Sequence, residues 1–501
     1  MEQTLRLFFL SFLELVLAQN FLFGTLRGEK YNLVQLHWQL FTNFAAMKLP
    51  GEFIKQLRGL MPDEWEALAD AICGTEPSVA VRVNGLRGMS VPQGARQVPW
   101  CPAGFYTAGR PAFTFDTDWH AGRYYVQDAS SMFIAHVVRH LVQEPVRYLD
   151  LCAAPGGKTT AAMQALPAGS TVVANEIVPA RARVLADNVT RWGNPRCVVT
   201  SNAPTHIGKF THFFDVIASD VPCSGEGMMR KDDEAVAQWS PTLVEQCALR
   251  QREILTDVWD ALRPGGLLFY STCTYNRQEN EEMVEFIVNE LGASPVEVPV
   301  EDTWNIHPAI GSDYPCYRFM PHRVDGEGLF MAALRKCGDS RRQDARSKVK
   351  PPKNADETAK KWMNSPSDYC IDLQGDTLIA VPRDMAQEAA ALRAALNVLH
   401  AGVELATVMG RKTVPHHALA LSAALAHGAF PLCEADYPTA LRYLRGEAVT
   451  LRDATRGHVL VTHKGAVLGF ANNLGNRANN MYPKGLRILS THLPDTKPMV
   501  L

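Results

Sequence analysis

The sequence lacks several features that mark particular classes of protein. Its 501 residues carry a formal net charge of only −2, so bulk charge does not point to a nucleic-acid partner, and any basic surface has to be local. No pair of CxxC or HxxxH units offers a metal site, and we expect no metal. The eleven cysteines are scattered, which indicates free thiols in a reducing cytoplasm rather than a disulfide framework.

A hydrophobic run long enough to cross a membrane is also missing. The stretch from Leu5 to Leu26 is rich in Leu and Phe, but Glu14 and Gln19 interrupt it, which disfavours a membrane helix. A signal peptide is another interpretation. We favour an extension upstream of the true start, because a more ordinary sequence begins at Met47. A cytoplasmic protein with no membrane partner is expected, and nothing demands more than a monomer.

The length of the chain predicts two to four domains. Apolar residues at helical spacing between Phe53 and Leu68, followed by a strand-like run, indicate a small α+β module near the start. Between Arg341 and Lys361 eight Lys or Arg face three Asp or Glu, which indicates a flexible basic linker. The predicted division is an N-terminal extension (1–46), an N-terminal α+β module (47–135), a central domain (136–336), a basic linker (337–361), a linking domain (362–435) and a C-terminal domain (436–501).

Strand-like and helix-like segments alternate between residues 146 and 291. We expect helices between the strands, including one from Gln246 to Leu262 that Pro264–Gly266 would stop. This alternation predicts an α/β fold with a doubly wound, mostly parallel sheet and right-handed crossovers. A mainly β segment with Gly, Asn, Lys and Arg in its loops closes the chain and is typical of an RNA-binding appendix. The expected strands of the central sheet are 146–151, 171–175, 197–200, 214–218 and 266–270.

A tight loop of small residues follows the first of these strands and enters a helix. Small residues let the backbone approach a ligand, and the helix start offers free N–H groups and a positive dipole end. Glu176 follows the second strand, where an acid can accept hydrogen bonds from a ribose diol. By this logic an S-adenosylmethionine site fits as well as a dinucleotide site. The loop consists of Cys152, Ala153, Ala154, Pro155, Gly156, Gly157 and Lys158.

Two cysteines lie just past the carboxyl ends of strands, where ligands bind in open α/β sheets. Cys223 follows the strand at 214–218, and Cys273 follows the strand at 266–270. A thiolate can add to carbon 6 of a pyrimidine and make carbon 5 electron-rich enough to take a methyl group from a sulfonium. Asp220 is placed to donate a proton to ring nitrogen 3 if it is protonated when it acts. This chemistry favours S-adenosylmethionine as the cofactor but does not rank the two thiols.

Three motifs resemble those of the RNA cytosine-C5 methyltransferases, the Sun/Fmu family. The motifs are 152–158, 220–227 and 271–274. Segments 230–232 and 239–241, together with the C-terminal segment, are similar to the bacterial branch that methylates small-subunit ribosomal RNA, the RsmF type. The resemblance implies a Rossmann-like class I methyltransferase fold, a PUA-like C-terminal domain, S-adenosylmethionine as the cofactor, and ribosomal RNA of the small subunit as the partner.

The resemblance also assigns roles to individual residues. It implies that Cys273 is the nucleophile and that Cys223 assists release of the enzyme from the methylated RNA. Residues 152–158, Glu176 and Asp220 would line the cofactor site, with Asp220 also facing the target base. Asn202 stands where many members of the family place an acid, and its carbonyl oxygen can still accept a hydrogen bond from the adenine amino group.

Other functions stay open at this stage. A transfer-RNA substrate is not excluded. A ribosome-assembly factor that binds RNA without methylating it is a second alternative, against which the intact Cys223, Cys273 and Lys158 argue. A DNA cytosine methyltransferase is a third, in which the cysteine of the Pro222-Cys223 pair would be the nucleophile. The additional Thr-Cys-Thr cysteine and the PUA-like end favour RNA.

Overall fold

The computed structural model describes residues 49–88, 91, 93–338, 357–451 and 454–501, together with two short paired strands, β1 (Thr25–Leu26) and β2 (Glu29–Lys30). Most of the predicted extension and most of the predicted basic linker lie outside these residues. Among the residues described, no helix is both long and apolar enough to cross a membrane. The same residues contain no cluster of three or more His, Cys, Asp and Glu side chains that could hold a metal ion.

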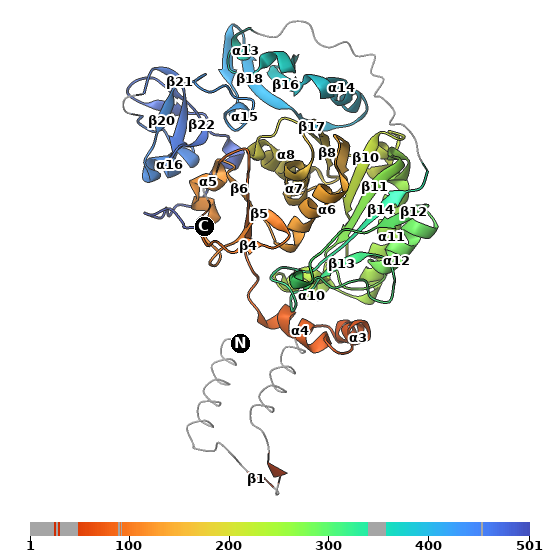
Figure 1. The fold of residues 1–501 in the computed structure, drawn as a ribbon. Coiled ribbons are helices and arrows are strands. Elements are labelled where there is room, and N and C mark those ends of the chain that lie inside the picture. The colour runs from red at the N-terminus through yellow and green to blue at the C-terminus, as the bar shows by residue number, and fades with distance from the viewer. Residues whose placement is uncertain are drawn as a thin grey trace.

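A nine-stranded sheet forms the centre of the molecule (Figure 1). Its strands run in the order β12-β14-β11-β10-β7-β8-β9-β17, and β13 pairs with β14 off this path. The five strands from β11 to β9 are parallel, which confirms the predicted doubly wound, mostly parallel sheet. The bounds are β7 (Arg147–Asp150), β8 (Thr171–Asn175), β9 (Cys197–Thr200), β10 (Phe214–Asp220), β11 (Leu262–Thr272), β12 (Ala293–Val296), β13 (Cys316–Phe319), β14 (Leu329–Lys336) and β17 (Val398–Ala401).

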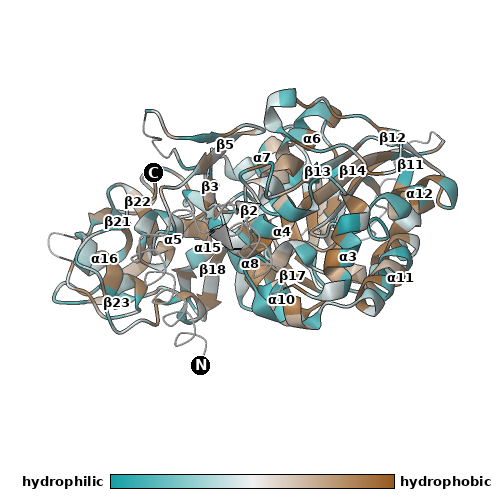
Figure 2. Cartoon of the chain, turned by 90° about the horizontal axis from the view of Figure 1, so that it is seen from below, coloured by the Kyte–Doolittle hydropathy of each residue, from teal (hydrophilic) through white to brown (hydrophobic). Residues whose placement is uncertain are grey.

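Helices cover both faces of this sheet. Successive side chains of a strand point to opposite faces, so one strand packs against helices on both sides. On β10, Val216 packs in the hydrophobic cluster with α6, α7 and α8, whereas Ile217 packs in the cluster with α11 and α12. Helices α11 and α12 carry both hydrophilic and hydrophobic residues in Figure 2, as expected for helices with one solvent face. The helices are α6 (Phe133–Leu141), α7 (Gly157–Ala165), α8 (Pro179–Trp192), α9 (Pro204–Gly208), α11 (Pro241–Val258) and α12 (Glu281–Asn289).

The boundary between α11 and β11 differs from the prediction. The helix already begins at Pro241, because the Ser240 hydroxyl accepts a hydrogen bond from the Leu243 N–H (3.1 Å). It ends at Val258, and Pro264–Gly266 lie inside β11 instead of stopping a helix. The pairing of β11 with β10 shifts register there, and such irregular strand starts tolerate proline and glycine.

The expected α+β module precedes the central sheet. Helices α3 (Gly51–Leu60) and α4 (Trp65–Gly74) pack together and against Met229, Trp239 and Met320. They lie below the carboxyl ends of β10 and β11 in the view of Figure 1. A four-stranded sheet in the order β4-β5-β3-β6 follows them. Its elements are β3 (Ala80–Val83), β4 (Gln97–Val98), β5 (Cys101–Tyr106) and β6 (Tyr124–Val126), and the short helices nearby are α5 (Thr117–His120) and α10 (Asp233–Gln238).

The C-terminal part contains two further four-stranded sheets. Strand β17, which follows α14, belongs to neither of these sheets. It pairs antiparallel with β9 at the edge of the central sheet, a connection that the sequence did not predict. The elements of the first sheet region are β15 (Tyr369–Gln374), β16 (Thr377–Pro382), β18 (Val403–Met409), β19 (Lys412–Pro415), α13 (Glu357–Lys360), α14 (Ala386–Ala395) and α15 (His417–Ala420). Those of the second are β20 (Leu432–Glu434), β21 (Gly457–His463), β22 (Ala466–Asn473), β23 (Ala478–Asn480) and α16 (Tyr437–Leu444).

Gly193 ends α8 at the junction with this C-terminal part and provides a test of the contact. Its φ is +78°, and a Cβ added there would lie 2.0 Å from the Leu421 carbonyl oxygen. Gly193→Ala therefore strains the backbone, at roughly 1–3 kcal/mol, and also pushes the two parts away from each other. We expect a lower Tm in thermal unfolding than for Gly375→Ala, where φ is +62° and no atom lies within 4 Å of the added Cβ. Equal losses in the two variants would contradict a contribution from the junction.

Candidate active site

The structure brings the two predicted thiols together. Strands β10 and β11 are parallel neighbours, with Asp220 opposite Ser271, so the loops that follow them leave the sheet side by side. The sulfur atoms of Cys223 and Cys273 lie 3.2 Å apart, and both cysteines are free and partly exposed. The Cys273 N–H also points to the Cys223 sulfur at 3.4 Å. The pairing of the two strands therefore places the two thiols next to each other at this edge of the sheet.

The environment of Cys223 affects its protonation. The hydrogen bond with Cys273, together with burial, raises the pKa of Cys223 well above its ordinary value. Cys223 is therefore held as a neutral thiol at neutral pH. A neutral thiol can donate its hydrogen to a neighbouring thiolate, and the only sulfur within this distance that the structure describes is that of Cys273.

Asp220 joins the thiols to the motif loop of the first strand. Its carboxylate accepts hydrogen bonds from the Lys158 ammonium (2.9 Å) and from the Ser271 hydroxyl (2.8 Å). Burial by itself would lower the pKa of Lys158, but the charge of Asp220 and the hydrogen bond to it outweigh burial and raise that pKa. Lys158 therefore carries a proton at neutral pH and places it next to Asp220.

A cleft opens beside Asp220, at the carboxyl end of β7 and the start of α7. Seven of the predicted cofactor-site residues line it: Cys152, Ala153, Ala154, Pro155, Gly157, Lys158 and Asp220. The first-turn N–H groups of α7 have no partner within the helix and face its amino end. The arrangement offers backbone donors, a cation and carboxylates to one small ligand.

Three predicted residues do not line this cleft. Gly156 is the N-cap of α7 with φ +108°. Glu176 follows β8, is 3% exposed, accepts a hydrogen bond from the Val178 N–H (3.0 Å) and forms an ion pair with Arg181 (3.4 Å). The Asn202 carboxamide is engaged elsewhere, because its oxygen accepts a hydrogen bond from the Asn397 N–H (3.1 Å). A contact between Asn202 and adenine would require that bond to break.

Several lining residues were missed by the sequence reasoning: Tyr125, Val126, Gln127, Asp128, Ser131 and Asp150. The Asp128 carboxylate accepts a hydrogen bond from the Ser131 N–H (2.9 Å). Its other oxygen accepts one from the Glu327 N–H (2.9 Å). The sequence carried one signal for this wall, a strand that ends in polar residues directly before a helix.

A buried arginine of the N-terminal module supports the motif loop from behind. Arg82 on β3 donates hydrogen bonds to the side chains of Gln127 (2.9 Å), Gln164 (2.7 Å) and Thr160 (2.6 Å). Its side chain is almost fully buried and lies over the Trp192 ring. A buried guanidinium requires such a complete set of acceptors. The N-terminal module is therefore part of the cleft's framework.

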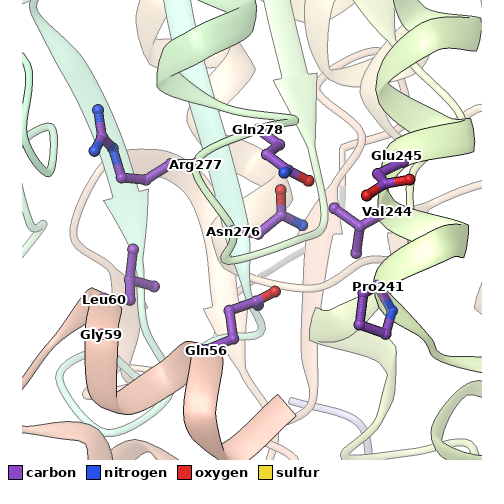
Figure 3. A pocket seen from close by; sticks show the side chains of 9 residues that line it. All are labelled: Gln56, Gly59, Leu60, Pro241, Val244, Glu245, Asn276, Arg277 and Gln278. Carbon is purple, nitrogen blue, oxygen red and sulfur yellow. The ribbon is translucent and has the colours of Figure 1, made fainter. Parts of the chain in front are cut away.

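A second hollow lies outside the loop that follows Cys273 (Figure 3). Helix α3, the start of α11 and residues 276–278 enclose it. Neither cysteine of the pair nor Asp220 is among its lining residues, so it is separate from the cleft beside α7. Its lining residues are Gln56, Gly59, Leu60, Pro241, Val244, Glu245, Asn276, Arg277 and Gln278.

Comparison with known proteins gives matches along most of the chain. A model of the 16S rRNA methyltransferase RsmB/F family matches residues 140–335. Models of the N-terminal domain of 16S rRNA methyltransferase RsmF and of the methyltransferase RsmF PUA domain match residues 49–129 and 430–488. A relative from Erwinia tasmaniensis, named ribosomal RNA small subunit methyltransferase F, is 30% identical over 470 residues, which span 87% of this chain and 96% of the relative. This chain belongs to the RsmB/F family of 16S rRNA methyltransferases.

Other matches agree with this family. A relative of the same name from Pectobacterium atrosepticum is 32% identical over 316 residues, which span 59% of this chain and 64% of the relative. A methyltransferase homologue from Pyrococcus horikoshii has a similar fold, with a TM-score of 0.51 and 24% identity over 59% of this chain and 98% of its own. The resemblance to the Sun/Fmu family and the class I methyltransferase fold predicted from the sequence are confirmed.

The buried carboxyl group of Asp150 gives a pH-dependent prediction. Burial raises its pKa to about 7 from an ordinary value of 3.8. Between these values the folded state holds a proton that the unfolded chain lacks, so this group favours folding less and less as pH rises toward 7. Asp150→Asn does not titrate. We expect thermal unfolding without cofactor to show a larger gain in Tm for the variant, relative to wild type, at pH 8 than at pH 5. An equal difference at both pH values would contradict the raised pKa.

Proposed function

We propose that this protein transfers a methyl group from S-adenosylmethionine to carbon 5 of a cytosine in small-subunit ribosomal RNA. The observation that carries the proposal is the pair of thiols 3.2 Å apart, next to the cleft of a class I methyltransferase fold. Relatives that align over almost their whole length are named ribosomal RNA small subunit methyltransferase F, which supports the methyl transfer and the small-subunit RNA. When bound, S-adenosylmethionine would supply an electrophilic methyl group.

The residues of the cleft fit this cofactor. Backbone N–H groups at the start of α7 and the small side chains of residues 152–157 allow the close approach that a nucleoside with an amino-acid tail requires. Asp220 and Asp128 provide carboxylates for its ammonium group. Glu176 lies just past the neighbouring strand, outside the lining of the cleft, and would have to turn from the Val178 N–H toward the cleft to accept hydrogen bonds from the ribose. Asn202 stays a prediction for the adenine contact.

Cys273 acts as the nucleophile in this proposal. Its thiolate adds to carbon 6 of the cytosine, and the electron pair displaced to carbon 5 would take the methyl group, while the sulfonium sulfur keeps the electron pair of the broken bond and leaves as a thioether. Asp220 contacts the target base, and as charge builds on nitrogen 3 a proton passes from Lys158 across their 2.9 Å hydrogen bond to the Asp220 carboxylate and from there to nitrogen 3. Solvent then takes the proton of carbon 5, nitrogen 3 returns its proton through Asp220 to Lys158, and the bond between sulfur and carbon 6 breaks with its electron pair on Cys273 as the double bond of the ring re-forms.

Cys223 assists the last step. Its raised pKa keeps the thiol protonated, and its sulfur lies 3.2 Å from the sulfur that must leave the base. A hydrogen bond from the Cys223 thiol stabilises the departing Cys273 thiolate, which speeds the breakage of the adduct. The two cysteines thus have unequal roles although they lie side by side.

RNA binding is assigned to the outer parts of the chain. The target base must leave its stack to reach the thiol. We propose that the N-terminal module (47–135), the basic linker (337–361) and the PUA-like domain (436–501) hold the RNA while domain 136–336 performs the transfer and the linking domain (362–435) connects them. Such binding weakens as salt rises. A cytoplasmic, monomeric enzyme is part of the same proposal.

Cys273→Ala tests the nucleophile. We expect methyl transfer to fall by at least about 10³-fold, because the covalent step has no substitute, while RNA binding is retained. Labelled methyl transfer to isolated small subunits, followed by bisulfite sequencing, measures the rate and maps the cytosine. Full activity of the variant would overturn the mechanism. Methyl label in transfer RNA instead of ribosomal RNA would show that transfer RNA is the substrate. RNA binding by the wild-type protein without any methylation would favour a ribosome-assembly factor.

Cys223→Ala tests the release step. We expect a covalent complex of protein and RNA to accumulate, because the methylated adduct forms but breaks slowly. A denaturing gel with labelled RNA detects this complex as a slower band that depends on the cofactor. Cys370→Ala, which changes a partly exposed cysteine of β15, serves as the matched control and should give no such band. An active Cys223→Ala enzyme without the band would remove the release role.

A further inference from the structure

Two buried glutamates lie beside the thiols and have no role in the mechanism above. Glu226 comes three residues after Cys223, and Glu279 comes six residues after Cys273. Both side chains are fully buried, with 0% exposure. A buried carboxylate costs free energy unless hydrogen bonds satisfy it, so their partners show what they hold in place.

Glu226 belongs to the loop of Cys223 but binds the loop of Cys273. One of its oxygens accepts hydrogen bonds from the backbone N–H groups of Tyr275 (2.7 Å) and Asn276 (2.9 Å). The following residue makes a similar connection, because the Gly227 N–H donates to the Cys273 carbonyl oxygen (2.8 Å). The backbone that carries the proposed nucleophile is thus fixed from the loop of the other thiol.

Glu279 makes the reverse connection. It belongs to the segment after Cys273, and it accepts hydrogen bonds from the backbone N–H (3.0 Å) and the hydroxyl of Ser224, the residue directly after Cys223. The side-chain amides of Asn276 (2.8 Å) and Gln251 (2.7 Å) donate to the same carboxylate. All these partners donate hydrogen bonds, so the side chain at position 279 has to accept hydrogen bonds at both of its terminal atoms.

The geometry points to a reciprocal clamp: we propose that Glu226 and Glu279 are positioning residues that set the distance between the two thiols. Each glutamate is carried by one cysteine loop and binds the backbone of the other loop. The parallel strands bring the loops to the same edge, but strand pairing ends at Asp220 and Ser271. Beyond that point the clamp holds the sulfur atoms, an inference that rests on the proposed function for its catalytic meaning.

The clamp also reaches the N-terminal module. The second oxygen of Glu226 accepts hydrogen bonds from the Gln56 amide on α3 (2.8 Å) and from the Trp239 indole (3.0 Å). Figure 3 shows Gln56 rising from α3 toward the loop that carries Asn276. The ring of Trp239 in turn packs against the ring of Phe53 of α3, with 5.1 Å between the ring centroids. One carboxylate therefore connects helix α3 to the loop of the nucleophile.

Glutamine variants test the clamp. Glu226→Gln and Glu279→Gln keep the size of the side chain but turn an NH₂ group toward hydrogen-bond donors, which separates the two loops. We expect kcat to fall about 100-fold, because a shift of about 1 Å at the nucleophile suffices for that loss, while KM for RNA changes little. The matched control is Glu388→Gln, which changes a buried carboxylate paired with Arg147 at the opposite end of β7.

A second readout does not depend on methylation. Diamide takes up two electrons and two protons while two adjacent thiols form a disulfide, and mass spectrometry measures the peptide that joins Cys223 to Cys273. We expect this cross-link to form about 10-fold more slowly in both glutamine variants than in wild type or in Glu388→Gln, since the sulfur atoms no longer face each other. The cross-link assay is informative even if wild type methylates no RNA, in which case the proposed function fails separately.

The outcomes are distinct. Folded glutamine variants, checked by circular dichroism, that cross-link and methylate at wild-type rates would overturn the clamp. Losses of the same size in Glu388→Gln would reduce the effect to general destabilisation and would also overturn it. If a glutamine variant fails to fold, Ser224→Ala takes its place, because it removes the hydroxyl that donates to Glu279 and contacts the Thr274 hydroxyl (2.9 Å), while the Ser224 N–H still binds Glu279. We expect about a 10-fold lower kcat for it, and an unchanged kcat would count against the clamp.

Discussion

The parallel pairing of β10 with β11 is the constraint on which the site depends. It places Asp220 opposite Ser271, and the carboxyl ends of parallel strands meet at one edge of a sheet. Two cysteines fifty residues apart in sequence thereby reach a sulfur–sulfur distance of 3.2 Å. The strands themselves are held by apolar packing on both faces, where Val216 and Ile217 of β10 enter different hydrophobic clusters.

Polar groups then define the chemistry at this edge. Asp220 is oriented by Lys158 and Ser271, while the loops beyond it are tied together through buried carboxylates. Hydrogen bonds to charged groups in a buried setting are directional and strong. Apolar packing brings the loops near each other, whereas these bonds fix the relative positions of the reactive atoms.

Each neighbouring part of the chain contacts the site through a defined group. Arg82 of the N-terminal sheet holds the motif loop, and Gln56 of α3 binds Glu226. From the C-terminal side, β17 extends the central sheet, and the Asn397 N–H donates a hydrogen bond to the side-chain oxygen of Asn202. The N-terminal module, which is proposed to bind RNA, is thus packed directly against the loops that carry the site.

The sequence by itself determined the class of fold, the loop 152–158, the two cysteines and Asp220, because strand periodicity, small-residue loops and motif spacing are local signals. It misplaced the end of α11, since Pro264–Gly266 looked like a helix stop until the bulged pairing of β11 with β10 was known. Only the tertiary structure decided that Asn202 is engaged by Asn397 and that Glu226 and Glu279 cross between loops. These contacts join residues from different strands and domains, and no local pattern in a single sequence encodes such partners.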